Sequence, residues 1–316
     1  MKFVGADLHK QSITFCVVES VRGRIQLVTR KRLMCYRTDQ IRSFLGSLER
    51  FQLVVEATIG YDWFAALAEE SAERVVIAHA GKLRIIAEST RKTDKIDAWI
   101  LAEFLAHDMI PEAWRATPRV RSHRALVRRR QKIQSRITSI KNTIRGLLTR
   151  YNADRKDLFT QKGRKAIEKL KMLAEERWVL EDLWEDLDQA SARLKAVDRR
   201  LVEFAVKAPQ KEQEARAVLA TMPGMGPVTI ETILAELGDG ERVRCADAGV
   251  AFAGLDPGVR ESDGRRRDLK LTKAGSPLLR WILIQLAHRV KRTSARWRSR
   301  FERLSKRIGK KKATCA

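Results

Sequence analysis

The sequence predicts a chain of three parts: an α/β domain over residues 1–115, long helices over 116–212, and a mainly α-helical domain over 213–305. Three observations predict this division. Short apolar runs alternate with amphipathic segments in the first part, as in a sheet covered by helices. Leucines recur every seven residues in the second part. Helical spacing on both sides of a glycine-rich turn marks the third part, and the basic residues 306–316 are expected to form a disordered tail.

The first part has the element order of a ribonuclease H fold, β-β-β-α-β-α-β-α. Strands are expected at residues 4–7, 12–19, 24–31, 51–56 and 74–79, and helices at 38–50, 61–70, just after Gly81, and 94–107. Turn residues separate these runs, and Cys16 is expected to be a small buried residue of the second strand. This order also predicts acidic residues on the first strand, after the fourth strand and on the last helix.

Four carboxylates occupy those places. Asp7 ends the first apolar run and Glu56 ends the fourth, while Asp94 and Asp97 lie three residues apart at the start of the last helix and so share one face. Carboxylate oxygens suit hard ions such as Mg²⁺. Two such ions can stabilise both the attacking and the leaving oxygen of a phosphodiester displacement. The alternative is that all four are surface acids, which is the commoner case for any one of them alone.

The composition points to a polyanionic partner. The 316 residues include 64 Lys and Arg against 39 Asp and Glu, a formal net charge of +25. Release of counterions from phosphates drives binding to such a protein. An anionic membrane is the alternative partner, but no segment resembles a spanning helix and no signal peptide opens the chain, so nucleic acid is favoured and no membrane is expected. The four cysteines lack zinc-ligand spacing and suit a reducing cytoplasm.

The long-helix part begins with a strongly basic segment. Lys and Arg crowd residues 119–150, with Arg128, Arg129 and Arg130 adjacent, while apolar residues from Ile133 to Leu147 follow the spacing of one buried seam. A phosphate-binding face is favoured over a helix that is merely solvated, because few acids offset the charge.

A heptad repeat follows the basic segment. Leu173, Leu180, Leu187, Leu194 and Leu201 recur at intervals of seven. The seam could close an antiparallel hairpin with the preceding helix or form a coiled coil between subunits, and the pattern favours the second interpretation.

The third part opens with the pattern of a helix-hairpin-helix turn. Apolar helical residues precede Thr221, and others continue beyond Gly224 and Gly226. Glycines let backbone approach a phosphate closely, and the following helix N-terminus offers free N–H groups. The alternative is a plain helical turn with no ligand.

Glycines and a proline place Ser262 in an exposed loop between arginines. A serine held among guanidinium groups can approach a phosphodiester, although a lone loop serine is usually only solvated. The arginines expected to bind nucleic acid here are Arg260, Arg265, Arg266, Arg267 and Arg280.

These motifs together resemble the DEDD transposases of bacterial insertion sequences, which have a RuvC-like N-terminal domain and are also described as bridge-RNA-guided serine recombinases. The resemblance covers nearly the whole chain. Its motifs are Gly5-Ala-Asp7-Leu-His-Lys10, Val55-Glu56-Ala-Thr-Ile-Gly60-Tyr61, Lys92-Thr-Asp94-Lys-Ile-Asp97-Ala98, Pro223-Gly224-Met-Gly226-Pro-Val-Thr, Phe252-Ala-Gly254-Leu-Asp-Pro257 and Gly275-Ser276-Pro-Leu-Leu-Arg280.

The resemblance implies that Asp7, Glu56, Asp94 and Asp97 hold divalent metal, and that the serine after the Gly-Leu-x-Pro motif attacks DNA to form a phosphoserine link. By motif alignment that serine is Ser262. The usual Ser-Gly pair is here Ser262-Asp-Gly, and Ser276 is the competing candidate, although it lies where a helix N-cap is expected.

The resemblance also implies donor and target DNA as substrates, a structured guide RNA encoded by the element, and a homo-oligomer between dimer and tetramer with a composite site. It implies a bacterial cytoplasmic protein associated with the nucleoid. Two rival functions remain: a structure-specific endonuclease that uses the same acids with water as nucleophile, and a non-catalytic nucleic-acid-binding protein.

Overall fold

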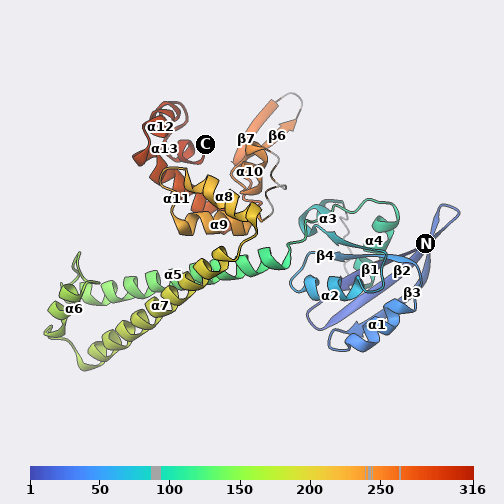
Figure 1. Cartoon of the computed structure of the whole chain (residues 1–316), viewed down its shortest axis with the longest axis horizontal. Helices are drawn as coiled ribbons and strands as arrows, with labels where there is room; N and C mark the ends of the chain where they lie inside the picture. Colours follow the sequence, from blue (N-terminus) through green and yellow to red (C-terminus); the bar gives the residue numbers. More distant parts are fainter. Residues whose placement is uncertain (87–93, 239, 241–242, 244, 263–264) are drawn as a thin grey trace. The chain divides into compact units, whose positions relative to one another are not determined.

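The computed structural model describes residues 1–86, 94–238, 240, 243, 245–262 and 265–316, and the side chains of residues 84–86, 94–96, 262, 265–266 and 268 lie outside that description. The chain divides into two compact units, Met1–Arg115 and Ala116–Ala316 (Figure 1). The division expected at residue 212 therefore falls inside the second unit.

The first unit is a mixed sheet with helices on both faces. Its elements are β1 (Lys2–Leu8), β2 (Ser12–Val21), β3 (Arg24–Met34), α1 (Thr38–Gly46), β4 (Phe51–Glu56), α2 (Tyr61–Ala68), β5 (Arg74–Ala78), α3 (Ala80–Ile86) and α4 (Asp94–Ala106). The strand order is β3-β2-β1-β4-β5. Strands β1 to β3 pair antiparallel, whereas β1, β4 and β5 pair in parallel. This arrangement is compatible with the predicted ribonuclease H-like fold.

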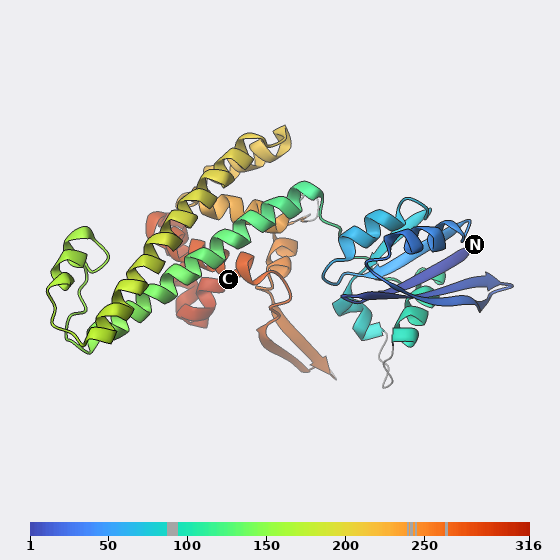
Figure 2. The same cartoon turned by 90° about the horizontal axis from the view of Figure 1, so that it is seen from below.

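Alternation along the strands assigns each side chain to one face of the sheet. Val4 and Ala6 belong to the core cluster that α1 and α2 cover, as do Leu53 and Val55 of β4. Residues of opposite parity face α3 and α4, where Val54 packs with Leu83, Leu101 and Leu105. Figure 2 shows the two helix layers on either side of the sheet. Cys16 is fully buried on the α4 side, as the sequence predicts.

The second unit is built around two long helices. Its elements are α5 (Pro118–Thr149), α6 (Gln161–Glu168), α7 (Ala174–Val206), α8 (Gln210–Ala220), α9 (Pro227–Leu237), α10 (Ala246–Phe252), β6 (Pro257–Ser262), β7 (Arg265–Leu271), α11 (Pro277–Thr293), α12 (Ala295–Ile308) and α13 (Lys310–Cys315).

Helices α5 and α7 lie side by side within the chain (Figures 1 and 2). Ile137, Ile140 and Ile144 of α5 pack with Leu180 and Leu187 of α7 in one buried cluster. The preference for a coiled coil between subunits is therefore corrected for Leu180, Leu187 and Leu194, which pack against α5 of the same chain. Leu173 precedes α7 and is 67% exposed. A heptad pattern shows that a helix has one apolar seam but does not identify its partner. The connection through α6 turns the chain back, so that α7 packs along α5.

The end of the chain also differs from the expectation. Residues 306–316, predicted to be a disordered tail, complete α12 and form α13, and Ala313 is 6% exposed. The apolar residues Ile308 and Ala313 interrupt the lysines and let this segment pack on α11 and α12. None of the described helices is long and apolar enough to cross a bilayer.

Candidate active site

Asp7 and Glu56 lie next to each other at the ends of two parallel strands. Ala6 pairs with Val55, so Asp7 and Glu56 are the next residues along β1 and β4. Both have the parity of Gly5 and Val54, which places them on the face of the sheet that α4 covers. The Asp7 side chain is 14% exposed, and its Oδ2 lies 3.1 Å from Nε2 of His9.

Helix α4 brings Asp97 to the same face. An added Cβ on Gly5 would collide with the carbonyl oxygen of Ala98 and lie 2.6 Å from the amide nitrogen of Ala102, so helix and strand are in backbone contact there. Asp97 precedes Leu101 by one turn, and Leu101 is buried against the sheet. The half-buried side chain of Asp97 therefore lies on the sheet-facing side of α4.

Strand β1 and helix α4 lie beside each other and run in opposite directions. Phe3 packs in the cluster of Leu101 and Leu105, whereas Gly5 contacts Ala98. Moving along β1 towards Asp7 therefore leads along α4 towards its first turn, where Asp97 lies. Asp94 is the first residue of α4, but its side chain lies outside the described residues.

These carboxylates supply the donor chemistry of a divalent-cation site. Asp7, Glu56 and Asp97 offer only oxygen, which hard ions prefer. Within the described residues no three His, Cys, Asp or Glu side chains come close enough together to hold a metal ion. The donor type and the common face therefore fit a divalent metal.

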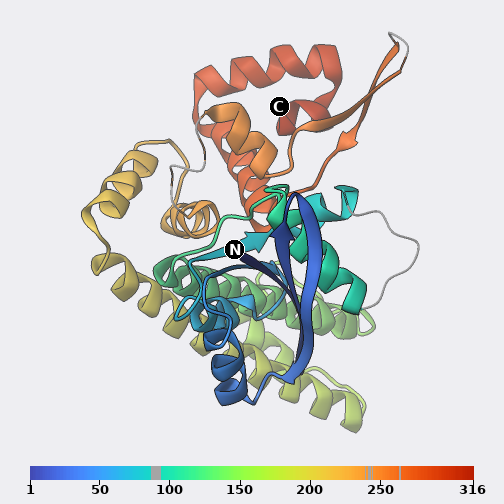
Figure 3. The same ribbon diagram turned by 90° about the vertical axis from the view of Figure 1, so that its right-hand side faces the viewer.

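Ser262 is the last residue of strand β6, which corrects the expectation of an exposed loop. Strands β6 and β7 form a two-stranded hairpin that projects from the helices of its unit (Figure 3). Ser262 pairs with Arg265, and Arg260 pairs with Arg267. The expected arginines thus flank the serine along the hairpin, although the side chains of Ser262, Arg265 and Arg266 are not among those described. Asp263 and Gly264 lie outside the described residues.

Two glycines fix the base of this hairpin. Gly254 has a φ of +64°, and a Cβ on it would lie 2.6 Å from the amide nitrogen of Ala274. A Cβ on Gly275 would collide with the carbonyl oxygen of Phe252. The hydroxyl of Thr272 donates to Oδ1 of Asp256 at 2.6 Å across the same base. Backbone packing therefore sets the direction in which the serine strand leaves the helices.

Ser276 has the helix-capping role that its sequence context predicts. Its hydroxyl oxygen accepts a hydrogen bond from the Leu279 N–H at 3.3 Å, at the start of α11. Burial raises the pKa of the nearby Glu236 carboxyl, but hydrogen bonds from Arg128 and Ser276 outweigh that effect and leave the pKa lowered. A serine occupied in this way is a poorer nucleophile candidate than Ser262.

The adjacent arginines of α5 divide into two kinds. Arg128 donates to both carboxylate oxygens of Glu236, at 2.8 and 2.9 Å, and Arg130 pairs with Asp198 of α7 at 2.6 Å. These two tie α5 to neighbouring helices. Arg129 is exposed and has no carboxylate partner among the described residues. Binding of phosphate by all three stays a prediction, and Arg129 is the one that the fold leaves available.

The other residues predicted to contact nucleic acid lie in the turn before α9, at the start of α11 and on the hairpin. Gly224 has a φ of +80° in the turn between α8 and α9, and Gly226 is the N-cap of α9. Arg280 donates to the carbonyl oxygen of Ala253 at 3.0 Å, which ties α11 to the end of α10. Arg260 and Arg267 are exposed.

Sequence reasoning did not single out the exposed arginines of α12 as candidate nucleic-acid contacts. Residues 277–316 contain 13 Lys and Arg against a single acid, Glu302. Helix α12 has no fully buried residue, and its exposed Arg303 and Arg307 have no carboxylate partner in the described part of the chain. The alternation of arginine with apolar residues in α12 was the available signal.

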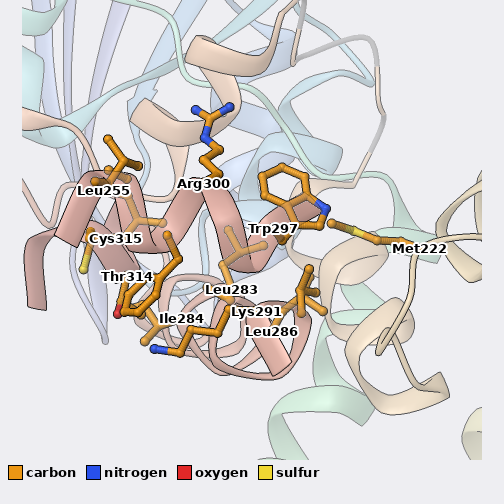
Figure 4. Close-up of a pocket in the computed structure, with 16 residues that line it drawn as sticks. Met222, Leu255, Leu283, Ile284, Leu286, Lys291, Trp297, Arg300, Thr314 and Cys315 are labelled. Carbon is orange, nitrogen blue, oxygen red and sulfur yellow. The ribbon is translucent and has the colours of Figure 1, made fainter. Parts of the chain in front are cut away.

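A mostly apolar cavity of about 230 Å³ lies among α11, α12 and α13 (Figure 4). Leu283, Leu286, Trp297 and Phe301 line it, and Lys291 lies 3.9 Å from the ring centre of Phe301. No Asp or Glu side chain lines this cavity, and the acids of the candidate site lie in the other unit, so the cavity belongs to the packing of the terminal helices.

Comparison with known proteins gives matches along most of the chain. A transposase model named for the DEDD enzymes of IS110 matches residues 4–153, and the model "Transposase IS116/IS110/IS902 family" matches residues 216–302. A probable family 20 transposase of Pseudomonas aeruginosa is 26% identical over 310 residues, covering 92% of this chain and 85% of that protein. The transposase for insertion sequence element IS1111A of Coxiella burnetii is 24% identical over 295 residues, covering 90% and 76%.

Proposed function

This chain belongs to the IS110 family of DEDD transposases, and we propose that it cuts and rejoins insertion-sequence DNA with a divalent-metal centre and a serine nucleophile. It is an enzyme that acts on DNA. The main support for the metal centre is that Asp7, Glu56 and Asp97 lie on one face of the sheet, at two parallel strand ends and the first turn of α4.

Asp7, Glu56, Asp94 and Asp97 are the residues proposed to hold the metal. Two Mg²⁺ ions bound there would supply positive charge to the phosphate oxygens of the scissile bond. His9 Nε2 lies 3.1 Å from Asp7 Oδ2 and orients that carboxylate. The backbone contact at Gly5 keeps Asp97 against the sheet, so the strand ends and the helix act as one rigid support.

Ser262 is the proposed nucleophile. Its Oγ bonds to phosphorus as the bond from phosphorus to the DNA 3′-oxygen breaks. The serine proton leaves to solvent or a base, and the departing 3′-oxygen takes up a proton. The products are a free 3′-hydroxyl and a phosphoserine ester with the 5′ phosphate. Arginines that flank Ser262 along the hairpin stabilise charge on the phosphorane.

A structured RNA encoded by the element is the second proposed partner, and it would select the donor and target DNA by base pairing. The family resemblance supplies this proposal. The net charge of +25 supports a protein that holds two nucleic acids at once. Assembly as a dimer or tetramer would let the acids of one subunit act with the serine of another.

Strand cleavage by an acid variant tests the metal centre. Asp97→Asn keeps the side-chain shape but removes the charge, so cleavage of element-junction DNA in Mg²⁺ should fall by at least about a hundredfold, as for other groups that stabilise transition-state charge. Asp108→Asn, whose side chain is 90% exposed, is the matched control in the same unit and should cleave like the wild type. Wild-type cleavage by Asp97→Asn, or undiminished cleavage in EDTA, would refute the assignment.

A further inference from the structure

The second unit contains a groove that the proposed reaction does not use. It has a volume of about 390 Å³ and lies where α5, α9 and α11 meet, beside the turn that contains Gly226. The side chains that carry the inference come from two helices: Arg130, Gln131 and Gln134 of α5, and Trp281, Gln285 and Arg289 of α11. The volume falls in the range of about 300–1,000 Å³ that is usual for small-ligand sites.

The α11 wall presents an aromatic ring, an amide and a guanidinium in one row. Trp281, Gln285 and Arg289 are spaced four residues apart, so their side chains share one face of the helix. Trp281 is 45% exposed, which is unusual for so large an apolar side chain. Arg289 donates to the carbonyl oxygen of Gly224 at 3.1 Å, which holds its guanidinium at the mouth of the turn. The row therefore offers a flat apolar surface beside a fixed positive charge.

Three glutamine amides border the same groove. Gln131 and Gln134 are half-buried and Gln285 is exposed. No hydrogen bond of their side-chain amides to another described residue is found in the structure. Each amide can donate two hydrogen bonds and accept two more, and a half-buried amide without a protein partner is suited to a polar ligand. No carboxylate lines the groove, whereas two arginines do.

We propose that this groove binds an unpaired nucleotide of a single-stranded nucleic acid. The base stacks on Trp281, the glutamine amides bond to the polar edge of the base, and Arg289 contacts its phosphate. A duplex cannot make these contacts, because its base faces are covered by neighbouring base pairs. The inference rests on the proposed function and deepens it, since strand exchange and an RNA loop both expose unpaired nucleotides.

Equilibrium binding of short fluorescent oligonucleotides in EDTA tests the proposal without any cleavage. Trp281→Ala should weaken binding of single-stranded oligonucleotides about tenfold, the size expected for one lost base stack, and Trp281→Phe should restore most of it. Trp178→Ala is the matched control, because Trp178 is 66% exposed on α7 outside the groove. Thermal unfolding of each variant checks that the fold is unchanged.

Two further oligonucleotides separate base stacking from phosphate binding. An abasic strand of the same length and the corresponding duplex should bind wild type and Trp281→Ala alike. Comparing the affinity for single-stranded DNA with that for RNA shows which nucleic acid the groove prefers. Equal binding of single strands by wild type and Trp281→Ala, or an equal loss on the abasic strand, would overturn the proposal. If Trp281→Ala binds single strands like the wild type but still cleaves DNA, the groove proposal fails and the proposed function stands. The two proposals can therefore fail separately.

Discussion

At the scale of single residues, Gly5 sets how closely α4 approaches the sheet. The helix backbone touches β1 at this position, two residues before Asp7 and beside Ala98. Gly5→Ala should therefore displace α4, lower the free energy of unfolding by about 1–3 kcal/mol, and reduce DNA cleavage strongly. Gly46→Ala is the matched control, because a Cβ on Gly46 meets nothing within 4 Å. Urea unfolding and cleavage rates measure both effects, and an unperturbed, fully active Gly5→Ala protein would contradict this account of the site.

The positions of Asp7 and Glu56 near strand ends could be predicted because apolar strand runs end visibly in the sequence. The predicted strand 51–56 is β4 itself, and Glu56 is its last residue. The strand that carries Ser262 could not be recognised in the same way. Its hairpin is rich in arginine, and without an apolar face period-two alternation gives no signal. Asp263-Gly264 between two runs is the hairpin signal that was available.

At the scale of elements, arginine–carboxylate pairs fasten α5 to the helices beside it. Glu236 has a side chain 2% exposed and is held by Arg128, whose side chain is 54% exposed. Arg128→Ala should leave a buried charge unpaired and lower the free energy of unfolding by about 1–3 kcal/mol, with little change in nucleic-acid affinity. Arg129→Ala should weaken nucleic-acid binding and leave the free energy of unfolding nearly unchanged. Unfolding and binding measured on both variants decide the matter, and a loss of affinity confined to Arg128→Ala would contradict the division of roles.

The cluster around Glu231 makes the junction of α5, α8 and α9 sensitive to acid. Burial raises the pKa of Glu231, but the close contact with His123 and the hydrogen bonds from Arg216 outweigh burial and lower it from 4.5 to about 2. His123 Nε2 lies 2.8 Å from Glu231 Oε2, and Arg216 Nε lies 2.6 Å from Oε1. Because the folded pKa is depressed, the associated stability is present above pH 4.5 and is lost as the pH falls towards 2.

The free energy of unfolding should consequently fall by on the order of 3 kcal/mol through this group between those pH values. Glu231→Gln should be less stable at neutral pH and should lose this part of the pH dependence. Glu181→Gln, at an exposed position of α7, is the control and should follow the wild type. Parallel pH profiles for Glu231→Gln and wild type would show that the cluster contributes nothing to acid sensitivity.

The partner of a helix is harder to predict than the helix. The seven-residue repeat correctly indicates one apolar seam on α7, but the same seam would serve an intrachain or an interchain partner. The packing of α5 against this seam depends on tertiary contacts that the repeat does not encode. The folding of residues 310–315 into α13 also depends on tertiary contacts, since a lysine run is equally compatible with a solvated tail.

At the scale of the whole molecule, the charge predicts how strongly nucleic-acid binding depends on salt. The chain carries a net charge of +25, and residues 277–316 hold 13 of its 64 Lys and Arg with one acid. The logarithm of the binding constant should fall linearly with the logarithm of salt concentration. Arg303→Ala and Arg307→Ala should each reduce that slope by roughly one. Arg42→Ala, which removes a surface partner of Glu70, should leave it unchanged, and identical slopes for all variants would exclude α12 from the binding surface.

Serine catalysis is tested most directly by a denaturing gel of the protein with labelled element-junction DNA, Mg²⁺ and the candidate RNA. Wild type is compared with Ser262→Ala and with Ser139→Ala, a control serine exposed on α5. We expect a covalent protein–DNA adduct with wild type and Ser139→Ala but none with Ser262→Ala. Cleaved DNA without an adduct in any sample would contradict it and indicate a nuclease that uses water.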